Sequence, residues 1–126
     1  MTRRWLIGIE SVTGTSAAIG GALLIARPDG HLVGAHTSAL AGSPFDTWLV
    51  PGILLMTLVG GGFLVAAGSL WTAHPLAPAV SIVAGLGLVG FEIFEVAWLG
   101  IQPLELIFMA VGVVVAGLGT RLLRQR

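Results

Sequence analysis

The sequence predicts an all-α fold, a bundle of four transmembrane helices with both chain termini in the cytoplasm. Of the 126 residues, 56% are hydrophobic and only 10% are charged, whereas about a quarter of the residues of a soluble domain carry a charge. The apolar residues form four segments, each near the roughly 20 residues that a membrane span needs. The arginines lie almost entirely at the two ends of the chain.

The first predicted helix covers residues 5–26 and is followed by a long outer loop. The sequence Arg-Pro-Asp-Gly at residues 27–30 ends the helix, because proline and glycine beside polar residues mark turns. The loop extends from Arg27 to Ser43. Median connections have about 4–6 residues, and longer ones are often functional, so we expect a distinct role for this loop.

The second predicted helix covers about residues 45–71. Ser43 is placed to be its N-cap and Pro44 to take its first position, while Asp46 falls in the first turn. A Pro-Gly pair at residues 51–52 follows one or two turns later. Because proline interrupts the hydrogen bonds of a helix, we expect a bend there.

The third and fourth predicted helices cover residues 76–99 and 103–123, and both have proline near their first turn. The connections at 72–75 and 100–102 are tight, so consecutive helices should run antiparallel. Residues 1–126 then form a single integral membrane domain.

The distribution of arginine predicts the orientation. Arginines precede the first helix and lie at the end of the fourth, and Arg27 alone lies in a connection; the terminal ones are Arg3, Arg4, Arg121, Arg124 and Arg126. Because basic residues favour the cytoplasmic side, both termini should lie there.

The four tryptophans support the same orientation. Trp5 and Trp71 fall at predicted inner ends of helices, and Trp48 and Trp98 fall at predicted outer ends. Tryptophan concentrates at both membrane–water interfaces, so this placement indicates an aromatic belt. An alternative is that residues 1–26 form a cleaved signal peptide, but Glu10 interrupts the apolar stretch, which exceeds the usual 7–15 residues.

Composition and motifs exclude several functions. The net charge is zero, which disfavours nucleic acid as a partner. There is no cysteine, and no phosphate loop, nucleophile elbow, HExxH or CxxC occurs. We therefore expect no cofactor and disfavour an enzyme. The expected surroundings are the lipid bilayer of the bacterial cytoplasmic membrane, with a homo-oligomer or larger membrane complex as the assembly.

The candidate functional residues are ionisable groups within the predicted spans, because each costs roughly 2.5–3.5 kcal/mol at a helix centre. Glu92 and Glu95 are three residues apart and share one face of the third helix. That face should point into the bundle, and it comprises Ser81, Gly85, Leu88, Glu92, Glu95 and Leu99.

The fourth helix is expected to bring a further carboxyl close to this pair. It presents Glu105, Phe108, Gly112, Ala116 and Gly119 on one face. The small residues of that face allow close backbone approach, which places Glu105 near Glu95 on the outer side. Glu105 also suits the first turn of its helix.

Two interpretations of this outer cluster remain open. Glu92, Glu95 and Glu105, together with Asp46, could bind a proton, a metal ion or a cationic ligand beneath a loop that carries His31 and His36. Like charges at this spacing disfavour ionisation of at least one of the carboxyls, which gives a group able to exchange protons. Alternatively, Glu92 and Glu95 serve packing, and the histidines are ordinary loop residues without a metal.

Glu10 lies near the inner end of the first helix. Glu10, Thr13, Gly14, Ala17 and Gly21 form a polar-to-small face that must point into the bundle or at another protomer. A polar track from Glu10 toward Glu92 would form half of a proton or ion path. In the alternative interpretation, the nearby hydroxyls bond to their own helix and Glu10 extends to the interface.

The chain shows two resemblances, of which the first spans most of its length. Its loop with Ser43-Pro44-Phe45-Asp46 and its glycine-rich second helix resemble small four-helix actinobacterial membrane proteins without an assigned activity, DoxX-like in size and arrangement. The stretch from Glu10 to Thr15 is similar to the glutamate-containing first helix of small multidrug resistance exporters. That resemblance implies a glutamate that exchanges protons for a cationic drug. The chain departs from those exporters in having no tyrosine, a long outer loop and two glutamates in the third helix.

Three functions follow as hypotheses. The first is proton- or cation-coupled transport through the intramembrane glutamates, in a chain that would dimerise to enclose a pathway. The second is a non-catalytic accessory, scaffold or lipid-interacting protein. The third is a membrane enzyme that acts on a lipid or quinone at the outer leaflet.

Overall fold

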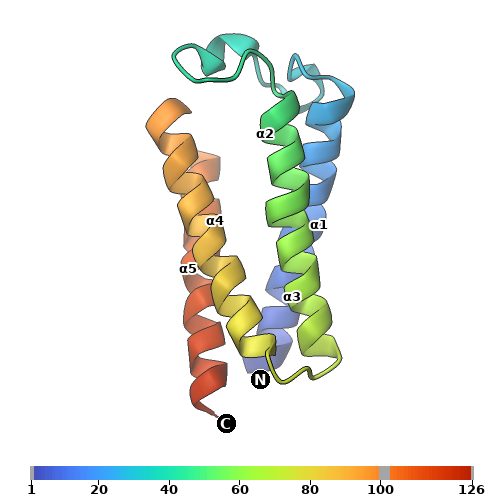
Figure 1. Ribbon diagram of the computed structural model, residues 1–126, viewed down its shortest axis with the longest axis vertical. Helices are drawn as coiled ribbons and strands as arrows, with labels where there is room; N and C mark the ends of the chain where they lie inside the picture. The colour runs from blue at the N-terminus through green and yellow to red at the C-terminus, as the bar shows by residue number, and fades with distance from the viewer. Residues whose placement is uncertain (1, 100–102, 126) are drawn as a thin grey trace.

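The computed structural model describes residues 2–99 and 103–125, and this part of the chain is helical with no strand. The helices stand side by side along one axis (Figure 1). The long helices are α1 (Thr2–Ala26), a second span made of α2 (Leu49–Leu54), η3 (Leu55–Gly61) and α3 (Gly62–Trp71), then α4 (Ala77–Leu99) and α5 (Pro103–Arg124). Two short 3-10 helices, η1 (His31–Val33) and η2 (Thr37–Leu40), lie in the loop after α1.

Among the described residues, four helical segments are long and apolar enough to cross a membrane, so the predicted all-helical fold with four spans of this length is confirmed. The two ends of the chain lie at the same end of the bundle (Figure 1). Trp5 and Trp71 lie at this end too, and both are well exposed, as expected of residues at an interface. The side chain of Trp98 lies outside the described residues.

The surface of the bundle is apolar along its length. Large hydrophobic side chains point outward from all four spans, among them Val12, Leu58, Val65, Val83, Ile107 and Val113. A soluble helix hides such residues on one face. Here they are more than half exposed, which fits contact with lipid chains.

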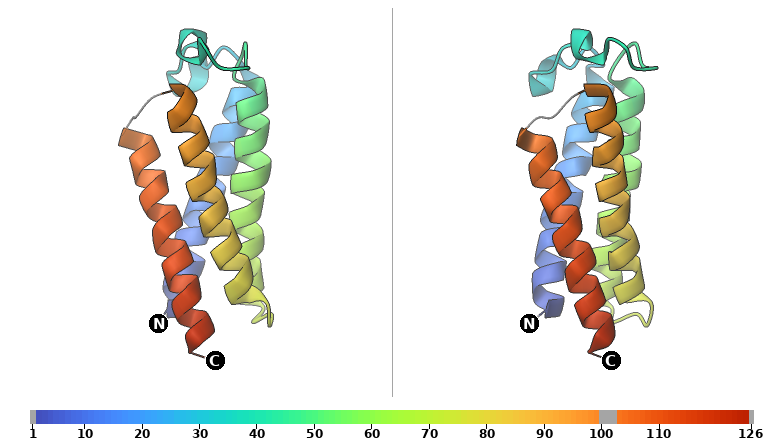
Figure 2. Two further views of the ribbon diagram at one scale, coloured as in Figure 1. Left: turned by 60° about the vertical axis from the view of Figure 1, so that its left-hand side comes forward. Right: turned by 90° about the vertical axis from the view of Figure 1, so that its left-hand side faces the viewer.

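The four spans form two helix pairs. α4 packs along α5, and α1 packs along the second span, whereas the contacts between these two pairs are less extensive. Figure 2 shows α4 and α5 running antiparallel beside the other pair. The core between the pairs is apolar and includes Leu6, Phe63, Leu70, Leu88 and Val115.

Glycine allows the close approach of α4 and α5. A Cβ atom added at Gly85 would lie 2.6 Å from both the Ala116 backbone nitrogen and the Gly112 carbonyl oxygen. A Cβ atom added at Gly112 would in turn lie 2.8 Å from the Gly85 carbonyl oxygen. These contacts confirm the expectation that small residues bring the two backbones together.

The small face of α1 packs in the same way on the second span. A Cβ atom at Gly21 would lie 2.6 Å from the Gly52 carbonyl oxygen, and one at Gly60 would lie 3.0 Å from the Ala18 backbone nitrogen. The predicted face of α1 that begins with Glu10 is therefore buried in the bundle; Glu10, Thr13, Gly14, Ala17 and Gly21 are all buried.

The second span begins at Leu49, four residues later than predicted, and Ser43, Pro44 and Asp46 precede it. The predicted N-cap is wrong because the Ser43 hydroxyl makes a local turn: its Oγ accepts a hydrogen bond from the Phe45 N–H at 3.2 Å. Asp46 is exposed in the loop and not in a first helical turn.

The second span departs from regular α-helix after α2, the segment that contains Pro51 and Gly52. Residues 55–61 form a π-helix whose turns are wider than those of an α-helix. Its inner residues Val59 and Gly60 are buried, so the widened turns lie against the bundle. The sequence pattern indicated a bend at the proline and not this π segment.

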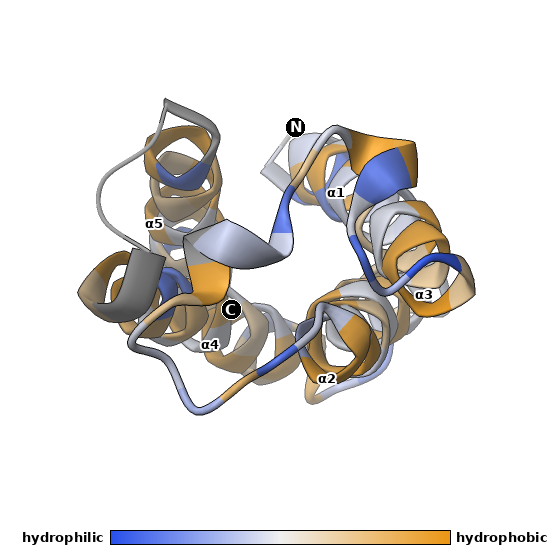
Figure 3. Ribbon diagram, turned by 90° about the horizontal axis from the view of Figure 1, so that it is seen from above, coloured by the Kyte–Doolittle hydropathy of each residue, from blue (hydrophilic) through white to orange (hydrophobic). Residues whose placement is uncertain are grey.

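The long loop after α1 folds over the end of the bundle opposite the start of α1, as Figure 3 shows from above. The Trp48 N–H donates to the Pro28 carbonyl at 2.8 Å, and the Trp48 indole donates to the His36 carbonyl at 3.1 Å. The Asp29 carboxylate accepts a hydrogen bond from the His31 backbone N–H in the first turn of the loop. This bond, together with the neighbouring Arg27, holds the pKa of the Asp29 carboxyl below its usual range. The loop is thus a folded cover rather than a plain linker.

At the opposite end, Arg3 closes the end of α3. Its guanidinium donates to the Leu70 carbonyl, from Nε at 2.8 Å, and to the Trp71 carbonyl at 3.3 Å. Carbonyls in the last turn of a helix lack partners and favour a positive charge.

We predict that Arg3→Gln lowers the stability of the folded protein by about 1 kcal/mol, since hydrogen bonds to charged groups are worth more than neutral ones. The measurement is thermal unfolding in detergent. Arg4→Gln is the control because Arg4 is the adjacent arginine and makes none of the three hydrogen bonds of Arg3 to the end of α3. Equal effects of the two substitutions would contradict a specific role for Arg3.

Candidate functional site

Glu10 is the most deeply buried carboxyl group in the described chain. It is 0% exposed, and both of its carboxyl oxygens lack a hydrogen-bond partner. Ser81 of α4 lies next to it and is also 0% exposed, and its Oγ also lacks a partner. The Ser81 hydroxyl lies close enough to the Glu10 carboxyl to interact with it across the contact between the helix pairs, but no hydrogen bond of regular geometry joins the two groups.

In the part of the chain that the structure describes, no basic side chain forms an ion pair with Glu10. The six arginines of the chain lie near its ends or in the outer loop, and the ion pair found within residues 2–99 and 103–125 is the exposed pair of Arg27 and Asp29. Burying a lone carboxylate costs far more than burying a neutral group. Glu10 therefore needs a proton or a bound cation to remain in this position.

Three further carboxyls meet near the outer end of the bundle. Glu92 of α4 and Glu105 of α5 are 2% and 5% exposed, and Glu95 is half-buried. Their charges act on one another: Glu95 and Glu105 both interact with Glu92, and Glu105 also interacts with Glu95. The structure therefore brings together the three glutamates that the sequence placed in one outer cluster.

An apolar layer separates the two groups of carboxyls. Leu88 lies on the same face of α4 as Ser81 and Glu92, between them in sequence, and is 1% exposed. Phe63 of the second span and Val115 of α5 belong to the same buried cluster. The predicted track from Glu10 to Glu92 is thus interrupted by the core, and passage between them requires movement of side chains or helices.

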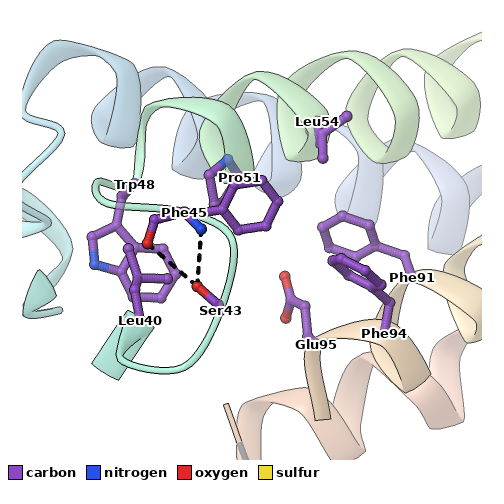
Figure 4. Close-up of a pocket in the computed structure, with 9 residues that line it drawn as sticks. All are labelled: Leu40, Ser43, Phe45, Trp48, Pro51, Leu54, Phe91, Phe94 and Glu95. Atoms are coloured by element: carbon purple, nitrogen blue, oxygen red, sulfur yellow. Dashed lines mark hydrogen bonds between the residues drawn. The ribbon is translucent and has the colours of Figure 1, made fainter. Parts of the chain in front are cut away.

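Besides its interactions with Glu92 and Glu105, Glu95 lines a pocket, which Figure 4 shows. Its carboxylate points into a small pocket between α4, the second span and the loop. Aromatic rings form much of the wall; these are Phe45, Trp48, Phe91 and Phe94. The rings of Phe45 and Phe94 pack edge to face with centroids 6.4 Å apart. The loop therefore contacts α4 one residue from Glu95.

The remaining predicted site residues lie apart from this cluster. Asp46, His31 and His36 are exposed on the loop, and the two histidines line a shallow surface depression with Asp29. Within the described ranges, no three histidine, aspartate or glutamate side chains are grouped to hold a metal ion. The outer loop thus supplies aromatic residues to the pocket and leaves its histidines at the surface.

Sequence reasoning missed the aromatic pocket. A signal was present, since Phe91, Phe94 and Glu95 are spaced by three and four residues and share one helical face. Their partners on the loop could not be identified, because the contact of Phe45 with Phe94 depends on how the loop folds back over α4.

Comparisons of the chain with protein-family models, with curated proteins and with solved structures find no match.

Proposed function

We propose that the protein is a small transporter of the bacterial cytoplasmic membrane, which moves a cation in exchange for protons carried by Glu10. The observation that supports this most strongly is the complete burial of Glu10 with two unpartnered carboxyl oxygens. Glu92, Glu95 and Glu105 would then form the outer station at which a cation collects. Arginine at both ends of the chain supports cytoplasmic termini.

The energetic argument starts from the environment of Glu10. Leaving a buried polar group without a partner costs about 1–3 kcal/mol, and an ionisable residue inside a membrane is by default a functional candidate. If position 10 served packing alone, leucine there would stabilise the bundle more than glutamate does. Exchange between a proton and a cation supplies a reason for a carboxyl at this position.

The two helix pairs provide the moving parts. Contacts within each pair are more extensive than contacts between the pairs, and Glu10 and Ser81 lie on either side of the boundary. Many transporters alternate access by rocking one bundle against another. Separation of the pairs would open Glu10 to one side, while the apolar layer at Leu88 closes the path to the other.

The second candidate function is that of a non-catalytic accessory or scaffold subunit. The continuous apolar core between Glu10 and Glu92 favours it, because no open path runs between the carboxyls in this conformation. In that role the glutamates would serve packing and specificity within the bundle, and the protein would not move protons.

Purified protein in proteoliposomes with a trapped pH-sensitive dye distinguishes these functions. Sodium, potassium, choline and tetraethylammonium chlorides are added outside, one at a time, as probes. We expect at least one to drive proton movement in the wild type, and Glu10→Gln to reduce the rate at least tenfold. Glutamine preserves size but exchanges no proton.

Arg4→Gln serves as the matched control, because Arg4 is exposed and lies outside the bundle. Unfolding temperatures of all variants show that they remain folded. Proton movement by Glu10→Gln at the wild-type rate would contradict the proposal, and no proton movement by the wild type with any probe would favour the accessory role.

A further inference from the structure

The pocket around Glu95 continues into a groove on the outside of the bundle. This groove lies between the second span and α4, has a volume of about 600 Å³, and is almost entirely apolar. Phe91 lines both spaces. On the second span, Leu54 lines the pocket and Leu58, one turn further along, lines the groove. The two spaces therefore meet end to end.

Small residues create the groove. Gly61 and Gly62 lie on its floor from the second span, and Ala84 and Gly87 from α4. A Cβ atom added at Gly62 or Gly87 would meet nothing within 4 Å, so the space beside them is open. The lining extends from Leu76, the residue before α4, to Phe91 within α4, about 22 Å at 1.5 Å per residue.

These dimensions suit an extended alkyl chain. The groove is longer than half of the roughly 30 Å hydrocarbon thickness of a bilayer, and its walls are hydrocarbon. In the membrane it faces lipid, so an alkyl chain can enter from the side. The end of the groove at Phe91 fixes where the head of such a molecule would lie.

The pocket determines the chemistry of that head. Its polar side chains are Glu95, whose carboxylate points into the pocket, and Ser43, whose hydroxyl is bonded to the Phe45 backbone; the aromatic rings of Phe45, Trp48, Phe91 and Phe94 form much of the wall. A carboxylate among aromatic rings favours a cation, because ring faces attract positive charge. A phosphate is disfavoured, since Glu92 and Glu105 lie close enough to interact with Glu95 or with each other.

The volume of the pocket selects among cations. It encloses about 20 Å³, and a cavity of about 10–15 Å³ holds one water molecule. A primary ammonium group is of this size, whereas a trimethylammonium group is larger. The apolar walls supply too few oxygen atoms to coordinate a bare metal ion.

We propose that this continuous site binds a long-chain primary amine, with its ammonium group at Glu95 beneath the loop and its alkyl chain in the groove between the second span and α4. The proposal shares Glu95 with the cation-collecting cluster of the proposed transport, but it requires binding at Glu95 and not proton exchange at Glu10. Loss of proton exchange in Glu10→Gln therefore tests transport alone, and loss of amine binding in Glu95→Gln tests this site.

Native mass spectrometry from a neutral detergent tests it with hexadecylamine as the probe. We expect one hexadecylamine per protein, and at least tenfold weaker binding of hexadecanol, hexadecyltrimethylammonium, phosphatidylethanolamine and methylamine. Hexadecanol lacks the positive charge, and hexadecyltrimethylammonium has a larger head. Phosphatidylethanolamine carries a phosphate beside its amine, and methylamine lacks the alkyl chain. Equal binding of any of them would overturn the corresponding part of the proposal.

Two variants locate the site. Glu95→Gln removes the charge, and Gly87→Leu fills the groove where the structure has open space. We expect each to weaken hexadecylamine binding at least tenfold. Gly90→Leu is the matched control, since Gly90 lies on the same helix, has nothing within 4 Å of an added Cβ and does not line the groove. Unfolding temperatures verify folding, and equal binding by all variants would overturn the site.

Discussion

Gly85→Leu is expected to destabilise the protein by about 3 kcal/mol, the upper part of the usual range for overpacking. A Cβ atom at Gly85 would lie 2.6 Å from backbone atoms of Gly112 and Ala116. Backbone cannot rotate away as a side chain can, so α4 and α5 must separate. Thermal unfolding in detergent measures the loss.

Gly90→Leu provides the comparison on the same helix, because a Cβ atom there meets nothing within 4 Å. It replaces glycine with a better helix former in the same way. The difference between the two variants therefore isolates the contact with α5. Similar unfolding temperatures for both would show that the close approach of α4 and α5 is not needed for stability.

Glu10→Leu is expected to raise stability by about 2 kcal/mol while abolishing proton exchange. Leucine has a similar size and removes a buried group whose oxygens have no hydrogen-bond partner, and relief of such a group is worth about 1–3 kcal/mol. Gain of stability with loss of function is the usual pattern at functional sites. Unfolding temperature and proton flux are measured on the same preparation.

Ser81→Ala completes the comparison, since Ser81 faces Glu10 and its Oγ also lacks a partner. We expect little change or a small gain in stability from this variant. If Glu10 were a packing residue held by Ser81, both substitutions would lower the unfolding temperature. That result would favour the accessory role.

The helices could be predicted well from the sequence because lipid imposes a simple length and composition. α4 and α5 begin and end within one or two residues of the predicted bounds. The start of the second span could not be predicted, since Ser43 and Pro44 imitate a helix start. The loop instead folds through contacts with Pro28, His36 and Phe94, which are distant in sequence or depend on the tertiary fold.

The candidate site was predictable in part. Helical periodicity placed Glu10 and Glu92 on buried faces, and both are buried. It could not show that Glu10 faces Ser81, because that contact depends on the packing of α1 against the pair formed by α4 and α5. The π-helix at residues 55–61 and the groove beside it likewise result from packing between helices.

Infrared difference spectroscopy of the protein in lipid tests the central claim about Glu10 most directly. The spectrum reports the C=O stretch of a protonated carboxyl, and Glu10→Gln identifies the part that belongs to Glu10. If Glu10 exchanges a proton for a cation, this band is present without added cation and weakens when the cation that drives proton movement is added. A Glu10 band that does not respond to any cation, or no band that depends on Glu10, would contradict it.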